Sequence, residues 1–293
     1  KLEGQNLQGD ISGLRASLED PGSDGYVSWA RKLYERLILP LERDLANPHL
    51  IVIPHGILHY LPFNALKDGE NYLIDRYSIR FLPSASVMEY FRESRSGVQE
   101  KLMAVGNPEL GERKAPLTHA EEEAKAIAQS FPDSTLLLRE DATETVFKKV
   151  GASFDLIHLA THGFFEAEHP LNSGLFLTAD QENDGFLAVD ELYSLELGSD
   201  LVTLSACETG LSKVSNGDEL VGLARGFLYA GASAIVASLW SVDDEATSYL
   251  MQKFYANLAK TSKRDALRLA QLETRKKHPH PFYWAAFQLT GSA

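Results

Sequence analysis

From residue 101 onward, short continuous apolar runs alternate with longer segments in which apolar residues recur every three or four positions. The continuous runs predict strands buried on both faces, and the periodic segments predict amphipathic helices. Such an alternation is typical of a mostly parallel sheet with helices over both faces, so we expect an α/β fold. The predicted strands cover residues 101–108, 134–139, 154–163, 174–179, 200–210 and 233–240, and the predicted helices cover 118–131, 143–150, 217–231, 244–260 and 262–276, with a last short element at 281–291.

The helix predicted at 118–131 begins with a capping signal. Thr118 stands where a cap is needed, and Glu121 follows three positions later. A hydroxyl and a carboxylate at that spacing can satisfy two unpaired backbone N–H groups reciprocally, so we predict a capping box here.

The first 100 residues have a different pattern, which predicts a smaller α+β subdomain. Apolar residues recur at helical spacing from residue 26 to 45, and Pro40 should kink or divide this helix. Strand-like pieces separated by Gly, Pro and Asn turn signals follow at 49–54, 57–63, 72–75 and 77–83. The polar stretch 91–101 marks the predicted boundary between a subdomain at 1–100 and a larger domain at 101–293.

Composition and charge narrow the classes of function. The net charge of −13 disfavours nucleic acid and membranes as direct partners, because phosphate binding needs clustered Lys and Arg. Cys207 is the only cysteine, which excludes an internal disulfide and suits a reducing compartment. No signal peptide is visible, and the apolar run 226–242 is short and rich in Gly, Ala and Ser, so we predict a cytoplasmic protein. The start at Lys1 suggests a fragment of a longer chain.

Two polar side chains follow predicted strands at equivalent points. His162 and Cys207 each come just after an apolar run, separated by 207 − 162 = 45 residues. Functional groups of parallel sheets gather beyond the carboxyl ends of the strands, so the two side chains are expected to lie close together. A histidine near a thiol can take its proton and later give it to a leaving group. The N–H groups of Gly163 and Cys207 are candidate donors to an oxyanion, so the set suits acyl transfer, most simply peptide hydrolysis.

Each of these residues also has a structural interpretation. A lone cysteine is usually a small buried apolar side chain, and a lone histidine is more often a satisfied core residue. His158 and His162 share a strand face, yet no convincing third ligand completes a metal site, and we expect His158 to pack and hydrogen-bond within the protein. Glu208, beside the thiol, is consistent with a solvated loop carboxylate.

Five segments resemble the CHAT domain, a caspase-like domain found beside TPR repeats. They lie at 51–66, 156–165, 201–210, 217–247 and 281–291, and the most specific motifs are ATHG, SACETG and LWSVDDEAT in this order. The resemblance covers about residues 26–291 and implies a caspase-like three-layer sandwich with a mostly parallel central sheet, preceded by the smaller α+β subdomain. The family is grouped with caspases, separases and gingipains, cysteine peptidases that use a His–Cys pair. The resemblance therefore implies His162 and Cys207 as catalytic residues and Gly163 in the oxyanion hole, with no cofactor or metal.

The same resemblance suggests a substrate pocket after the strand at 233–240. The segment ASLWSVDDEAT is similar to a separase stretch in which a Trp and an acid line the pocket for the residue before the cleaved bond. Trp240 would then form the wall and Asp244 the acid, with Asp243 as its rival, and Arg or Lys would be preferred. The alternative is that the acids simply begin a helix, as Asp218 and Glu219 are expected to do at 217–231.

We expect an endopeptidase that cuts a protein substrate when an attached TPR or sensor region, or an activator protein, switches it on. For this family the resemblance implies a prokaryotic defence or signalling setting. The main alternative is a catalytically silent caspase-like interaction module, and a nucleotide-binding α/β enzyme is disfavoured because AVGNP lacks a glycine-rich fingerprint. The polar segment 208–219 is the predicted mobile loop.

Overall fold

A computed structural model describes residues 7–90, 100–164, 166, 169–205, 207–208 and 218–293. The predicted domain boundary at 91–101 and the predicted mobile loop at 208–219 fall largely outside these residues. Within the described part of the chain, no helix is long and apolar enough to cross a membrane.

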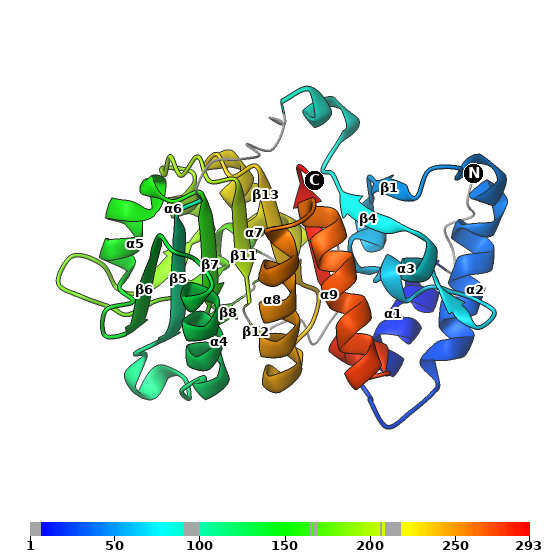
Figure 1. Cartoon of the computed structure of the whole chain (residues 1–293), viewed down its shortest axis with the longest axis horizontal. Helices are drawn as coiled ribbons and strands as arrows, with labels where there is room; N and C mark the ends of the chain where they lie inside the picture. Colours follow the sequence, from blue (N-terminus) through cyan, green and yellow to red (C-terminus); the bar gives the residue numbers. More distant parts are fainter. Residues whose placement is uncertain (1–6, 91–99, 165, 167–168, 206, 209–217) are drawn as a thin grey trace.

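An eight-stranded sheet runs through the centre of the protein (Figure 1). Its strands pair in parallel except for one antiparallel pair, β13 with β14, so the predicted mostly parallel sheet is confirmed. The order is β1 (His49–Val52), β4 (Ser78–Phe81), β14 (Phe287–Gly291), β13 (Ala234–Ser238), β11 (Leu201–Leu204), β7 (Leu156–Ala160), β5 (Leu102–Pro108) and β6 (Ser134–Arg139).

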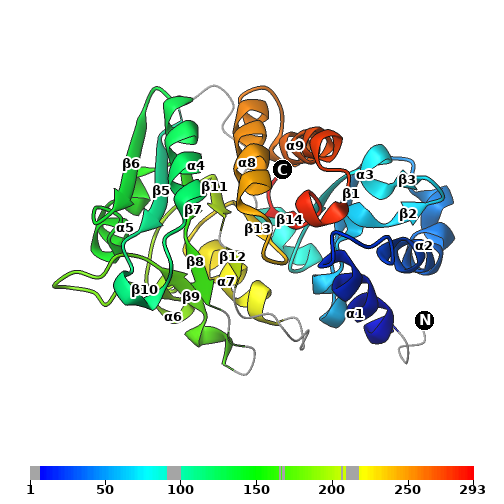
Figure 2. The same cartoon turned by 90° about the horizontal axis from the view of Figure 1, so that it is seen from below.

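Two hydrophobic cores lie on opposite faces of this sheet, because alternate residues of each strand point to opposite sides. On β13, Val236 packs into one core and Ile235 into the other. The first core is covered by α1 (Leu7–Leu18), α2 (Tyr26–Leu37), α4 (Thr118–Gln129), α8 (Asp244–Leu258) and α9 (Lys263–Lys277), and the second by α5 (Glu144–Val150), α6 (Val189–Leu192) and α7 (Asp218–Tyr229). Figure 2 shows α4, α8 and α9 in a row over one face. The layers are helix, sheet and helix.

A close approach between α4 and the sheet depends on Gly106 of β5. A Cβ atom at this position would lie 2.6 Å from Cβ of Ala124 and 2.8 Å from the carbonyl oxygen of Ala120. Glycine therefore lets α4 pack directly on the strand.

A second sheet of four strands continues from the carboxyl ends of β7 and β11. Its order is β10 (Phe186–Ala188), β9 (Gly174–Phe176), β8 (His162–Phe164) and β12 (Cys207–Glu208). The strands predicted at 154–163 and 200–210 each divide in this way, because the chain bends as it passes from the large sheet to the small one.

The N-terminal region joins the same large sheet through β1 and β4. The predicted division at Pro40 is confirmed, since α2 ends at Leu37 and a 3₁₀ helix covers Leu39–Asp44. The strand predicted at 57–63 is wrong, because Gly56–Tyr60 is a 3₁₀ helix that begins at a left-handed glycine (φ 54°). The strand predicted at 72–75 is mostly wrong too, since β3 (Asn71–Tyr72), which pairs with β2 (Lys67–Asp68), leads at once into α3 (Leu73–Arg76).

Candidate active site

The carboxyl ends of β7 and β11 bring the two predicted catalytic positions together. In the large sheet Leu159 of β7 pairs with Leu204 of β11. In the small sheet His162 of β8 pairs with Cys207 of β12, again in parallel. Both pairs are separated by 45 residues in the sequence, so the two segments keep the same register through the bend. His162 and Cys207 are therefore direct neighbours across two strands, about 5 Å apart by ordinary strand spacing.

Two hydrogen bonds secure the bend between the sheets. The Ser205 N–H donates to the carbonyl oxygen of Leu159 at 2.9 Å, which extends the ladder past β11. The hydroxyl of Thr161, which is fully buried, donates to the carbonyl oxygen of Phe176 in β9. Thr161, the residue directly before His162, is therefore fixed to the neighbouring strand β9.

The ring of His162 is half-buried, and one hydrogen-bond partner is defined for it within the described part of the chain. Its Nε2 lies 2.9 Å from the carbonyl oxygen of Ala115. Because a carbonyl only accepts, the neutral ring must carry its proton on Nε2, and Nδ1 keeps a free lone pair. Nδ1 is buried and has no hydrogen-bond partner among the described residues. This tautomer can accept a proton through Nδ1, as a general base requires.

Ala115 was not predicted as part of the site, because a backbone carbonyl leaves no signal in side-chain identity. The residue is exposed and lies in the loop between β5 and α4. β5 neighbours β7 in the sheet, so the loop after it reaches the same edge as His162.

The capping box predicted at the start of α4 is wrong. The N-cap is Leu117, and no side chain of its own caps the helix. Glu121 instead accepts from Lys125 at 2.7 Å and from Arg139 at 2.7 Å, so these two cations pair with its carboxylate. Its hydrogen bond to Lys125 lowers the pKa of Glu121 below the usual range, helped by Asn107 and Arg139. The N–H of the N-cap residue Leu117 donates to Oδ1 of Asn107, a residue of β5, at 2.7 Å.

The residues after β13 lie beside this edge, since β13 neighbours β11. The exposed Asp243 is the N-cap of α8, and its Oδ1 accepts from the Ala246 N–H at 3.0 Å. Asp244 is half-buried in the first turn of that helix. Trp240 is only 3% exposed, and its indole N–H donates to the carbonyl oxygen of Phe282 at 3.0 Å.

The oxyanion position predicted at Gly163 lies in β8. Gly163 is buried and pairs with Leu175 of β9 on one side and with Glu208 of β12 on the other. Asp218 begins α7, so the helix start predicted there is confirmed.

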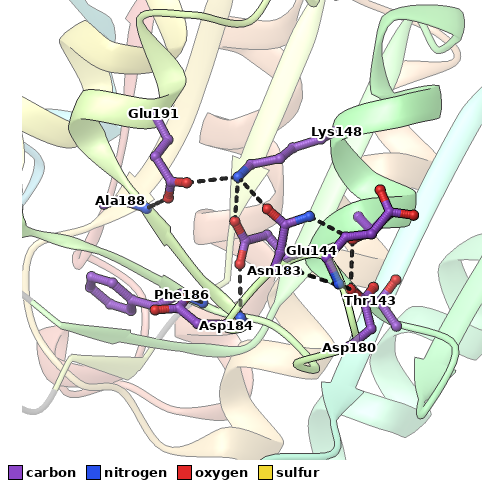
Figure 3. A network of polar contacts seen from close by, with 12 residues as sticks. Thr143, Glu144, Lys148, Asp180, Asn183, Asp184, Phe186, Ala188 and Glu191 are labelled. Carbon is purple, nitrogen blue, oxygen red and sulfur yellow. Dashed lines mark hydrogen bonds and ion pairs between the residues drawn. The ribbon is translucent and has the colours of Figure 1, made fainter.

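A network of polar side chains holds the outer part of the small sheet to α5 (Figure 3). Lys148 of α5 contacts Glu144 at 2.5 Å, Glu191 of α6 at 2.7 Å and the side-chain oxygen of Asn183 at 3.0 Å. The Glu144 carboxylate, which is 1% exposed, also accepts from the Gly185 N–H at 2.8 Å. Although burial lowers the pKa of Lys148, its hydrogen bonds to the two glutamates raise it above the usual range. The network therefore fixes the connection between β9 and β10.

His158 lies on β7, four residues before His162, and its contacts are those of a buried structural residue. Its ring is fully buried on β7, with Nε2 2.8 Å from the Glu123 carboxylate of α4. The hydroxyl of Tyr255 in α8 lies 3.3 Å from Nδ1 and donates to Thr203 at 3.0 Å. Burial raises the pKa of Tyr255 above its ordinary value. These contacts pin α4 and α8 to the strands that lead to the site.

Comparison with known proteins places these features in a family context. The family model named CHAT domain matches residues 28–292. The chain is 26% identical to Tetratricopeptide repeat protein 28 of Homo sapiens, over 89% of this chain, and 25% identical to Tetratricopeptide repeat protein 28 of Mus musculus, over 96%. It spans only 13% and 14% of the length of these two relatives.

Solved structures agree with the caspase-like arrangement. The separase–securin complex of Saccharomyces cerevisiae matches with a TM-score of 0.56 and 17% identity, over 83% of this chain and 15% of the matched chain. The Arg specific cysteine proteinase gingipain R matches with a TM-score of 0.54 and 10% identity, over 99% of this chain and 74% of the matched chain. At these identities the similarity concerns the fold, and it confirms the predicted caspase-like architecture.

Proposed function

Because the chain belongs to the CHAT domain family, we propose that it is a cysteine endopeptidase in which His162 activates Cys207. The observation that carries the proposal is the register of β8 and β12, which pairs these two residues directly. The contact between Nε2 of His162 and the Ala115 carbonyl supports it, because this contact leaves Nδ1 as the proton acceptor.

The reaction follows from these groups. Nδ1 of His162 takes the thiol proton of Cys207, and the thiolate attacks the carbonyl carbon of the cleaved peptide bond. The N–H groups of Gly163 and Cys207 donate to the resulting oxyanion. His162 returns the proton to the leaving amine as the C–N bond breaks, and water then hydrolyses the thioester.

We propose that the enzyme prefers a basic residue before the cleaved bond. The half-buried Asp244, in the first turn of α8, is the acid that we propose to meet an Arg or Lys side chain, and the exposed Asp243 caps the same helix. Gingipain R, which shares the fold, is described as Arg specific. Trp240, which is 3% exposed, is proposed as the wall of this pocket.

Regulation is proposed to come from outside the domain. The matched relatives are TPR proteins of which this chain spans a small part, so a TPR or sensor region, or a separate activator protein, is the proposed switch. The proposed setting is a prokaryotic defence or signalling system in the cytoplasm, and the proposed partner is a protein substrate.

A peptide library tests the proposal. Wild type, Cys207→Ala and Asp244→Ala are compared with activator-containing lysate present. We expect cleavage after Arg or Lys that disappears in Cys207→Ala and changes its preference in Asp244→Ala. Cleavage after another residue would support the peptidase activity and contradict the proposed basic preference of the pocket. The absence of Cys207-dependent cleavage would favour an interaction module.

A further inference from the structure

We propose that Asn107 is a positioning residue that holds the Ala115 carbonyl against His162 and so keeps the histidine ready to accept the thiol proton. The proposal rests on the proposed function, since it concerns the same His–Cys pair. Asn107 belongs to the AVGNP motif, for which the peptidase mechanism gave no role.

The backbone of Asn107 has a conformation that suits asparagine. The residue lies at the end of β5, is 4% exposed, and has a left-handed φ of 49°. Asparagine adopts this region more readily than most residues with a side chain. The turn directs the chain away from the sheet into the loop that contains Ala115.

The side chain of Asn107 closes this loop at its far end. Its Oδ1 accepts from the Leu117 N–H at 2.7 Å, and its Nδ2 donates to Glu121 at 3.2 Å. Leu117 is two residues beyond Ala115, so the anchor lies beside the carbonyl that contacts His162. The near end is fixed separately, since the Glu109 N–H donates to the Thr178 hydroxyl at 2.9 Å.

The anchor matters because the contact that it supports is exposed. Ala115 is open to solvent, so water competes for both its carbonyl and the Nε2 proton of His162. A loop free to move by about 1 Å would lose the bond most of the time, and misplacements of that size can cost a reaction roughly 100-fold. When the Ala115 carbonyl is absent, the ring is free to rotate or to place its proton on Nδ1, and it then no longer accepts from the thiol.

The chain offers a matched control at Arg139. This residue ends β6, the neighbour of β5, with a similar left-handed φ of 47°, and its side chain also contacts Glu121. Asn107→Gly and Arg139→Gly both relieve the left-handed backbone and both remove a partner of Glu121. Only the first removes the acceptor for the Leu117 N–H.

The test uses the single cysteine. Iodoacetamide alkylation of Cys207 is followed against pH in wild type, Asn107→Gly, Arg139→Gly and His162→Ala, with kcat/KM for peptide cleavage measured beside it. We expect Asn107→Gly to shift the alkylation midpoint toward that of His162→Ala and to lower kcat/KM roughly 10- to 100-fold. Arg139→Gly should keep the wild-type midpoint.

Thermal melting checks that each variant is folded. If Asn107→Gly does not fold, Leu117→Pro, which removes the N–H that donates to Asn107 and leaves Asn107 in place, is measured instead and should shift the midpoint in the same direction. A midpoint and kcat/KM in Asn107→Gly equal to those of Arg139→Gly would overturn the positioning role while leaving the peptidase proposal intact. A wild-type midpoint equal to that of His162→Ala, with no Cys207-dependent cleavage, would overturn both.

Discussion

Replacing Lys148 by Met should destabilise the protein by removing the cation from a buried carboxylate. Glu144, which contacts Lys148 (Figure 3), is 1% exposed, and among the described residues the Gly185 N–H would be the partner that its carboxylate keeps. Removing one partner of a fully buried ion pair costs about 3–5 kcal/mol. Lys148 itself is 22% exposed, so water can partly replace it, and we expect a loss of about 2–3 kcal/mol. In a domain of this size that corresponds to a fall in Tm of roughly 4–10 °C.

Lys149→Met is the matched control for this variant. Lys149 is the next residue on the same helix and pairs with Glu182 at 2.7 Å, but both side chains are about 60% exposed. Exposed pairs contribute about 0–1 kcal/mol, so its Tm should change little. Thermal unfolding followed by circular dichroism gives both values. Equal losses in the two variants would refute the reasoning, because the expected difference rests on the burial of the Lys148 contacts, above all that with Glu144.

The pH dependence gives a second check on the same pair. The pKa of Lys148 is raised in the folded protein above its unfolded value of 10.5, so its charge stabilises the fold fully below that pH. The contribution is lost as the pH rises through the folded pKa. The stability difference between wild type and Lys148→Met should therefore be constant near neutral pH and decrease only above about pH 10.5.

Two further substitutions, each with a matched control, test contacts in the first core, where α4 and α8 pack on the sheet. Gly106→Ala should lower the free energy of unfolding by about 1–3 kcal/mol, because its Cβ would lie 2.6 Å from Cβ of Ala124. The control Gly222→Ala in α7, whose nearest contact would be at 3.4 Å, should leave that free energy unchanged or raise it by up to about 1 kcal/mol. Urea unfolding measures both values. Tyr255→Phe should cost about 1–2 kcal/mol by leaving the buried Thr203 without its donor, and Tyr229→Phe, whose ring is 71% exposed, should change stability by less than about 0.5 kcal/mol. Calorimetry that ranks the two tyrosine variants equally would contradict the role of the buried hydroxyl.

The pairing of His162 with Cys207 could be predicted because the sequence carries two independent signals for it. Both residues follow apolar runs of the same kind, and the parallel sheet that these runs predict joins its carboxyl ends at one edge. His162 and Cys207 are 45 residues apart in the sequence, and the strand partners in both sheets differ by the same 45 residues. Local periodicity therefore indicated that the two residues follow neighbouring strands, whereas their catalytic roles rest on the resemblance to the CHAT domain.

The parts that could not be predicted depend on contacts between distant segments. Ala115 contributes a carbonyl, which any residue carries, and only the fold shows that it lies 2.9 Å from His162. The capping signal at Thr118 and Glu121 was overridden because Arg139 and Lys125 lie within reach of the same carboxylate. The segment 57–63 was predicted as a strand because a short apolar run does not distinguish a strand from a 3₁₀ turn that buries Tyr60.

The most direct test of the central claim is the pH dependence of Cys207 alkylation in wild type and His162→Ala. An unassisted thiol reacts with a midpoint near pH 8.5, whereas a thiol paired with histidine forms the thiolate at lower pH. We predict a wild-type midpoint clearly below 8.5 that returns to about 8.5 or higher in His162→Ala. Identical profiles for the two proteins would contradict the account, because they would show that His162 does not act on the thiol.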